Sequence, residues 1–248
     1  MIEPADKSAE RERLKMKRQT AVKIVVDVAM TAALLLLMAF ELIGRQAHEW
    51  IGTGMIVLFV VHHILNRRWT GHLLKGKYTP VRVFQTVLVF LVLICILSSV
   101  VSGIVMSRYV FDFLPIEGGR SWARIVHMLA AYWGFVCMSL HLGVHWNMMM
   151  GMAGKALGRT PDGKSPSGAS SARTWLLRIA GILVAGYGVY AFVRRGVTTY
   201  MFLRSVFVFF DYEEPLLFFY VDYIAVMGLF VWIGHYLAKL LRWAGTGR

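Results

Sequence analysis

Cysteine is scarce in this chain of 248 residues, which contains only two, Cys95 and Cys137. Both lie within long apolar runs, and no Cys-x-x-Cys pair occurs. The sequence therefore excludes zinc sites and iron–sulfur clusters that depend on paired cysteines. Covalently attached c-type haem is excluded as well, because there is no Cys-x-x-Cys-His motif. We interpret both cysteines as small buried hydrophobic residues.

Acidic residues and strand-like patterns are also scarce. The chain has 14 Asp and Glu against 27 Lys and Arg, a net charge of +13, yet 57% of its residues are hydrophobic. The basic residues lie in short loops beside apolar runs, so we interpret them as a topology signal and an attraction to anionic lipid, not to nucleic acid. Because no alternating strand pattern appears, helices are the only way for this chain to span a membrane. A mean hydropathy of +0.57 thus predicts an all-α integral membrane protein.

Six apolar segments are long enough to form transmembrane helices, at about 24–44, 48–65, 81–106, 121–149, 175–193 and 215–241. The first is followed by Glu41-Leu-Ile-Gly-Arg rather than by a small-x-small cleavage site, so we expect a membrane helix and not a signal peptide. Of the 27 Lys and Arg, 20 fall in the N-terminal tail, the loops after the second and fourth segments, and the C-terminus. The positive-inside rule therefore predicts that both termini are cytoplasmic.

The predicted domain organisation has four parts. A basic cytoplasmic tail (1–23) precedes a four-helix core (24–150). A flexible cytoplasmic linker rich in Gly, Ser, Pro and Lys (151–174) leads to a two-helix membrane module (175–248). Within that module, residues 194–214 combine aromatic and charged side chains and are too polar to span, so we expect an interfacial segment.

Four histidines carry the functional signal. His48 and His62 lie 14 residues apart in the second apolar segment, and His127 and His141 have the same separation in the fourth. Fourteen residues correspond to about 21 Å of helix and to four turns at about 3.5 residues per turn, so each pair faces one seam. Ionisable residues inside spans are functional by default. Two histidines near each end of such a seam suit the axial ligands of haem iron.

The topology adds an independent argument for two haem sites. One helix separates the two histidine-bearing segments, so they run parallel and place His48 level with His127, and His62 level with His141. We therefore expect two b haems, one near each membrane surface. Haem propionates need cationic partners, and arginine suits a carboxylate. The candidate partners are Arg45, Arg108, Arg120 and Arg124 at the outer site, and Arg67 and Arg68 at the inner site.

The inner end leaves alternatives open. His63 adjoins His62, and His145 lies one turn beyond His141, so either could replace its neighbour as an inner ligand. His145 could also contact a quinone headgroup. Asp27, Glu41 and Asp222 lie inside or at the boundary of the spans. They either carry protons coupled to quinol oxidation or pair with arginines, and the sequence does not choose between these roles.

Several segments resemble a known bacterial family. They are Ala47-His-Glu-Trp-Ile-Gly, Val61-His-His-Ile-Leu-Asn-Arg-Arg-Trp, His127-Met-Leu-Ala-Ala-Tyr-Trp-Gly-Phe-Val and Ser139-Leu-His-Leu-Gly-Val-His-Trp. Over roughly residues 20–150 the chain resembles the flavinylation-associated membrane cytochromes, formerly a domain of unknown function. The resemblance implies a b-type cytochrome of the bacterial inner membrane, similar to the cytochrome b subunits of formate dehydrogenases and hydrogenases. It also implies an extracytosolic partner that carries covalently bound flavin. The flavin attachment signature Asp-Gly-x-Thr-Gly-Ala-Thr is absent here, so any flavin belongs to the partner.

The expected function is transmembrane electron transfer between a quinone pool and an extracytosolic flavoprotein or other redox subunit. We expect an electron-transfer subunit rather than a stand-alone enzyme. Two alternatives remain: a proton-relaying transporter or channel without haem, and a membrane anchor subunit of a larger redox complex.

Overall fold

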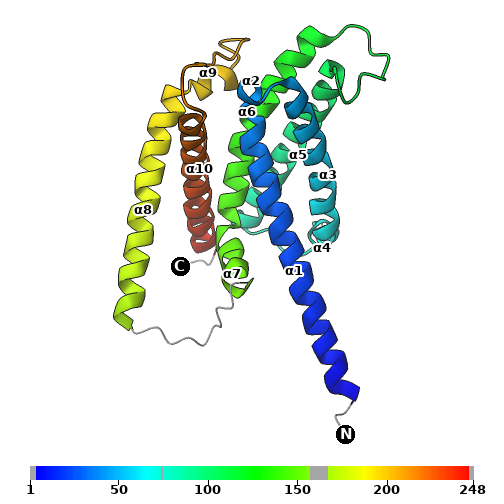
Figure 1. The fold of residues 1–248 in the computed structure, drawn as a ribbon. Coiled ribbons are helices and arrows are strands. Elements are labelled where there is room, and N and C mark those ends of the chain that lie inside the picture. The colour runs from blue at the N-terminus through cyan, green and yellow to red at the C-terminus, as the bar shows by residue number, and fades with distance from the viewer. Residues whose placement is uncertain (1–3, 74, 157–166, 246–248) are drawn as a thin grey trace.

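The computed structural model describes residues 4–73, 75–156 and 167–245, and these ranges form helices and connecting loops without a strand (Figure 1). The helices are α1 (Pro4–Leu37), α2 (Phe40–Ile43), α3 (Arg45–Leu65), α4 (Arg67–Gly71), α5 (Pro80–Met106), α6 (Arg120–Val144), α7 (Trp146–Ala156), α8 (Ser167–Arg194), α9 (Val197–Met201) and α10 (Leu216–Ala244).

Six of these helices are long and apolar enough to cross a membrane. The candidate spans are Arg18–Leu37, Arg45–Leu65, Pro80–Met106, Arg120–Val144, Thr174–Arg194 and Leu216–Ala244. The prediction of an all-α fold with six potential spans is therefore confirmed. One end of the bundle carries α2, α9 and the α5–α6 loop, and we call it the α9 end. The opposite end carries α4, α7 and both chain termini, and we call it the terminal end (Figure 1).

The predicted helix ends differ from the observed ones in three places. The first span does not run to residue 44, because α1 ends at Leu37 and Gly44, with φ of 79°, marks the start of α3. The fourth span ends at Val144, five residues earlier than predicted, and α7 follows it. The predicted linker 151–174 is helical at both ends, since α7 runs to Ala156 and α8 starts at Ser167; its middle, 157–166, lies outside the described residues.

Two other segments named from the sequence can be located. The tail 4–23 is continuous with the first span in one long helix. The segment 194–214 forms no span: it contains the short helix α9 and then a loop at the α9 end (Figure 1).

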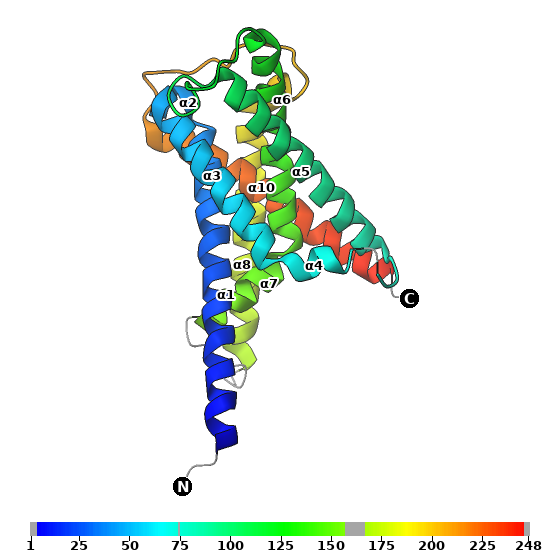
Figure 2. The same ribbon diagram turned by 90° about the vertical axis from the view of Figure 1, so that its right-hand side faces the viewer.

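Helix α10 packs against both α6 and α8, so the C-terminal helix pair is joined directly to the rest of the bundle (Figures 1 and 2). Glycines permit this close approach. A Cβ on Gly143 of α6 would overlap the Val231 carbonyl of α10, and a Cβ on Gly234 of α10 would overlap the Leu140 carbonyl of α6. Such small residues at helix contacts are typical of membrane bundles.

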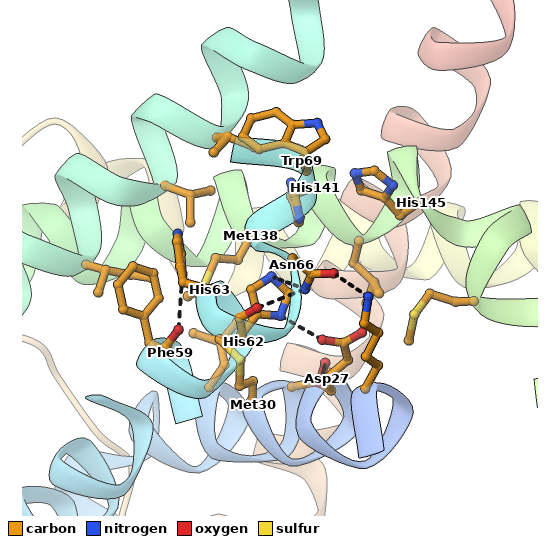
Figure 3. Close-up of a pocket in the computed structure, with 18 of the residues that line it drawn as sticks. Asp27, Met30, Phe59, His62, His63, Asn66, Trp69, Met138, His141 and His145 are labelled. Carbon is orange, nitrogen blue, oxygen red and sulfur yellow. Dashed lines mark hydrogen bonds and ion pairs between the residues drawn. The ribbon is translucent and has the colours of Figure 1, made fainter. Parts of the chain in front are cut away.

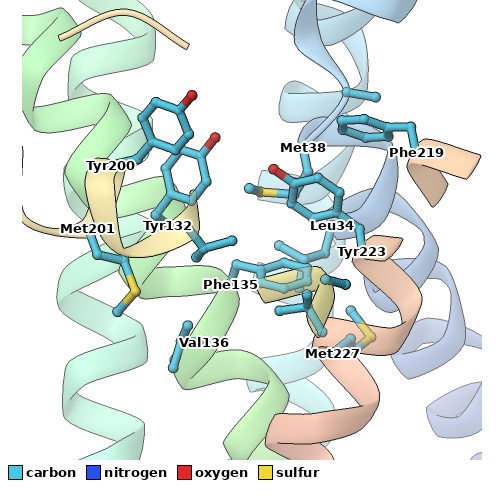
Figure 4. Packing of buried hydrophobic residues seen from close by; sticks show 14 of the residues in the cluster. Leu34, Met38, Tyr132, Phe135, Val136, Tyr200, Met201, Phe219, Tyr223 and Met227 are labelled. Atoms are coloured by element: carbon cyan, nitrogen blue, oxygen red, sulfur yellow. The ribbon is translucent and has the colours of Figure 1, made fainter. Parts of the chain in front are cut away.

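The main hydrophobic core lies among α1, α6, α9 and α10 (Figure 4). Phe135 of α6 is fully buried there, and its ring meets Tyr223 of α10 edge-on at 5.7 Å between centroids. Tyr132 of α6 stacks on Tyr200 of α9. Helix α3, by contrast, contributes a single buried residue, Met55. The helix that carries two of the four predicted ligands is therefore attached at the side of the core.

Candidate functional site

His48 and His127 face one another near the α9 end. His48 lies in the first turn of α3 and His127 in the second turn of α6. Their ring centroids are 6.0 Å apart, with an angle of 66° between the ring planes. Histidine nitrogens bind first-row metals at about 2 Å, and the ring centroid lies about 1 Å further out, so two axial imidazoles on one iron have centroids about 6 Å apart. The spacing of this pair thus fits bis-histidine ligation.

Helix α5 orients His127. The His127 Nδ1 lies 3.0 Å from the carbonyl oxygen of Ser99 and 3.1 Å from the hydroxyl of Ser102. Donation from Nδ1–H to that carbonyl leaves Nε2 as the free nitrogen, which is how ligating histidines are commonly held. Gly103 lies against the ring, since a Cβ there would be 3.5 Å from His127 Cε1. The sequence reasoning missed these α5 residues, although Ser99, Ser102 and Gly103 are small interruptions of an apolar run.

His48 carries an unused polar atom. Its Nδ1 is one of two buried side-chain polar atoms in the described part of the chain that have no hydrogen-bond partner, the other being Thr86 Oγ1. Buried polar atoms are rarely left unpaired, and an unpaired atom calls for an explanation such as an absent ligand. The Phe40 ring packs edge-on against the His48 ring at 5.0 Å between centroids. The donor set and its surroundings therefore fit a ligand held between the two histidines.

Glu49, the next residue after His48, anchors the start of α3. Its carboxylate accepts hydrogen bonds from the Ser107 hydroxyl at 2.7 Å and from the backbone N–H groups of Arg108 at 3.0 Å, Tyr109 at 2.9 Å and Val110 at 3.2 Å. A carboxylate that accepts several N–H bonds makes strong, charge-assisted contacts. Glu49 thus ties α3 to the loop after α5, beside His48. This contact could not be predicted from the sequence, because it joins segments about 60 residues apart.

At the terminal end, a cavity of about 390 Å³ opens between α1, α3, α5, α6 and α7 (Figure 3). His62, His63, His141 and His145 all line it. Cofactor pockets have volumes of about 300 to 1,000 Å³. The structure therefore brings both predicted inner residues and both alternates to one cavity large enough for a ligand.

The hydrogen bonds distinguish these histidines. His62 Nδ1 lies 2.8 Å from Asp27 Oδ1, and its Nε2 has a long contact of 3.5 Å with the Asn66 side-chain amide (Figure 3). His63 Nδ1 lies 3.1 Å from the Phe59 carbonyl, and its side chain is exposed. The rings of His141 and His145 are 4.8 Å apart between centroids.

Six methionines form much of the cavity wall: Met30, Met138, Met148, Met149, Met152 and Met227. Methionine side chains are apolar, polarizable and flexible, so they adapt to the shape of a bulky apolar ligand. The sequence reasoning missed this lining, because the six residues come from four different helices and share a wall only after folding.

The predicted propionate partners have different positions. Arg45 lies over the Phe40 ring and Arg124 over the Phe207 ring, while Arg108 and Arg120 are exposed at the α9 end. Arg67 and Arg68 are exposed on α4 and do not line the cavity. The cation in the cavity wall is Lys23, whose Nζ donates to Asn66 Oδ1 at 3.2 Å.

Within the described residues, no three His, Cys, Asp or Glu side chains converge into a site for a metal ion. Paired histidines suit a metal that brings its own equatorial ligands, as haem does.

No family model, curated protein or solved structure matches this chain. The functional argument therefore depends on the geometry of the two histidine sites.

Proposed function

We propose that this protein is a di-haem b-type membrane cytochrome that transfers electrons across the membrane. The observation that carries the proposal is the His48–His127 pair, with its 6.0 Å centroid separation, on two helices that also bring histidines to the terminal-end cavity. Matched histidines at both ends of two parallel helices support two cofactors, one near each surface.

In this proposal His48 and His127 would hold one haem, and His62 and His141 would hold the other. Haem, when bound, supplies the one-electron redox chemistry. The protein supplies the four histidines, and Ser99 and Asp27 hold the His127 and His62 imidazoles, respectively, in the required tautomer. Methionine side chains in the wall of the terminal-end cavity would contact the haem there.

We place the protein in the bacterial cytoplasmic membrane with both termini in the cytoplasm, because 20 of the 27 Lys and Arg fall in or beside the N-terminal tail, the loops after the second and fourth predicted spans, and the C-terminus. The α9 end is then the outer end, and the terminal end is the inner one. A quinone pool in the bilayer and an extracytosolic redox protein, such as a flavoprotein, are the proposed partners. The outer loop 202–214 is rich in exposed aromatic side chains, including Phe209 and Tyr212, which suits the membrane interface.

Electron transfer can be tested in lipid vesicles that contain the purified protein and trapped ferricyanide. Dithionite added outside should bleach the trapped ferricyanide faster than it does in protein-free vesicles. Vesicles that carry the double variant His48→Ala, His127→Ala are the matched control and should bleach at the protein-free rate. Equal rates for the wild type and for protein-free vesicles would contradict the proposed function.

A second candidate is favoured by one observation, the series of polar side chains Lys23, Asn66, His62 and Asp27 along the cavity wall at the inner end, in which Lys23 contacts Asn66 and His62 contacts Asp27. Such a series is typical of a proton relay in a transporter or channel. In that case the purified protein would lack a haem spectrum. After an external acid pulse, the interior of the vesicles would become acidic, as reported by a trapped pH-sensitive dye.

A further inference from the structure

We propose that Asp27 is a positioning residue that orients His62 as an iron ligand and makes the inner site the more reducing of the two. This inference rests on the proposed di-haem function. It attributes a difference in reduction potential between the two haems to one carboxylate. That difference sets the direction of electron flow.

Asp27 contacts His62 directly. Asp27 Oδ1 lies 2.8 Å from His62 Nδ1, and both side chains are largely buried, with exposed fractions of 21% and 26%. Lys23, one turn earlier on α1, does not neutralise this carboxylate, because its Nζ donates to Asn66 instead. The carboxylate of Asp27 is thus directed to the ring nitrogen of one predicted ligand.

This contact has a direct chemical consequence. When Nδ1–H donates to a carboxylate, Nε2 becomes the metal-binding nitrogen, and the ring becomes a more basic ligand. A more basic ligand, with a negative charge behind it, stabilises the ferric state more than the ferrous state. Hydrogen bonding to the axial ligand therefore lowers the reduction potential. The 3.5 Å contact between Asn66 and His62 Nε2 is too long for a normal hydrogen bond, so an iron bond at Nε2 displaces little.

Among the residues that the structure describes, no equivalent carboxylate contacts the ligands of the outer site. His127 Nδ1 lies against a backbone carbonyl and a hydroxyl, which are neutral, and His48 Nδ1 has no partner. The adjacent Glu49 carboxylate accepts hydrogen bonds from Ser107 and Tyr109 of the α5–α6 loop instead. The outer site should therefore have the higher potential, and electrons should move from the inner side to the outer side.

A purely structural role for Asp27 is the competing explanation, since the same contact joins α1 to α3. The two roles differ in what an amide would do. Asparagine retains an oxygen that accepts from Nδ1–H but removes the negative charge, so it preserves the link while it weakens the effect on the iron.

The test is a spectroelectrochemical titration of the purified protein, in the wild type and in a His48→Ala background in which only the inner haem remains. Asp27→Asn should change the ferric-to-ferrous ratio of the inner haem about tenfold in favour of ferrous, a rise of about 59 mV for a one-electron couple. The outer haem should keep its potential. Asp27→Glu should restore the wild-type value, and Glu41→Gln, which removes a carboxylate that contacts Tyr212 instead, should shift neither haem.

Each outcome decides the inference. If Asp27→Asn retains both haems with unchanged potentials, the contact is only structural and the inference is wrong. If Asp27→Asn loses the inner haem, Asp27→Glu decides: a retained haem at the wild-type potential supports the role of the carboxylate, and loss in both variants overturns it. A wild-type protein without haem would instead refute the proposed function, so the two failures are distinguishable.

Discussion

The two histidine sites of this protein differ in the number of histidines they contain and in the groups that surround them. At the outer end, two rings face each other at 6.0 Å, and the nearby polar contacts of His127 are neutral groups of α5. At the inner end, four histidines line an open cavity of about 390 Å³, together with a carboxylate, a lysine and flexible methionines. The outer site therefore has one plausible ligand pair, whereas the inner site has spare ligands and ionisable neighbours.

This difference teaches where substitution should have sharp consequences. A site with one ligand pair and rigid neighbours fails when either ligand is removed, because no other donor can take its place. A site with adjacent donors on adaptable walls can tolerate some losses.

Removal of an outer ligand should halve the haem content. His48→Ala and His127→Ala should each reduce it from two haems per chain to one, since a single remaining imidazole holds the outer iron weakly. Haem per chain can be assayed as the pyridine adduct. The control is His72→Ala, because His72 lies on the α4 cap and contacts the Arg68 carbonyl. If either variant lost the inner haem and retained the outer one, the pairing of His48 with His127 at the outer site would be wrong.

Removal of single inner histidines should distinguish ligands from neighbours. We expect His62→Ala and His141→Ala to lose part of the inner haem, because a neighbouring histidine can replace the missing ligand, and the matched variants His63→Ala and His145→Ala to retain all of it. The same assay in a His127→Ala background reports on the inner haem alone. If His63→Ala or His145→Ala proves the more damaging of its pair, that residue is the ligand.

Glu49 should matter for the outer site without being a ligand. Glu49→Ala leaves the Ser107 hydroxyl and three backbone N–H groups without their acceptor, which should destabilise the protein by about 1 to 3 kcal/mol. Thermal unfolding, followed by the outer haem absorbance, measures this loss. Glu49→Gln retains an acceptor oxygen and should show a smaller effect. An unchanged unfolding temperature in Glu49→Ala would contradict the anchoring role.

The smallest effect concerns the inner cation. Lys23→Gln should speed the release of inner haem to an excess of a haem-scavenging apoprotein, because Lys23 lies in the cavity wall. Arg67→Gln is the matched control and should release haem at the wild-type rate, since Arg67 is exposed and outside the wall. Faster release from Arg67→Gln than from Lys23→Gln would instead support Arg67, the partner predicted from the sequence, as the residue that contacts the haem propionate.

Much of this fold could be predicted from the sequence because the bilayer imposes simple rules. A membrane span needs about 20 apolar residues. The positions of the six spanning helices could therefore be predicted from hydropathy alone. The spacing of His48 to His62 and of His127 to His141 was informative because all helices share the same rise per residue. The end of α1 at Leu37 was not evident, because it occurs within an apolar run rather than at a polar boundary.

The partners of the histidines were much harder to predict. Which face of α5 meets His127, and which turn of α1 meets His62, depends on how the helices pack and rotate. Ser99 was therefore an ordinary residue until the fold placed it beside His127. Asp27 was expected to carry protons or to pair with an arginine, whereas the structure places it against His62. The same reason explains Lys23: the sequence offered many cations near the inner end, and packing selects the one in the cavity wall.

The haem content of the wild-type protein decides whether the two histidine pairs hold haem. The protein should be purified from cells that supply haem, and its reduced-minus-oxidised spectrum and its pyridine adduct should be measured against the chain concentration. We predict two b haems per chain. A value of one would contradict the paired-site account and require a new ligand set, and a chain free of haem would refute it.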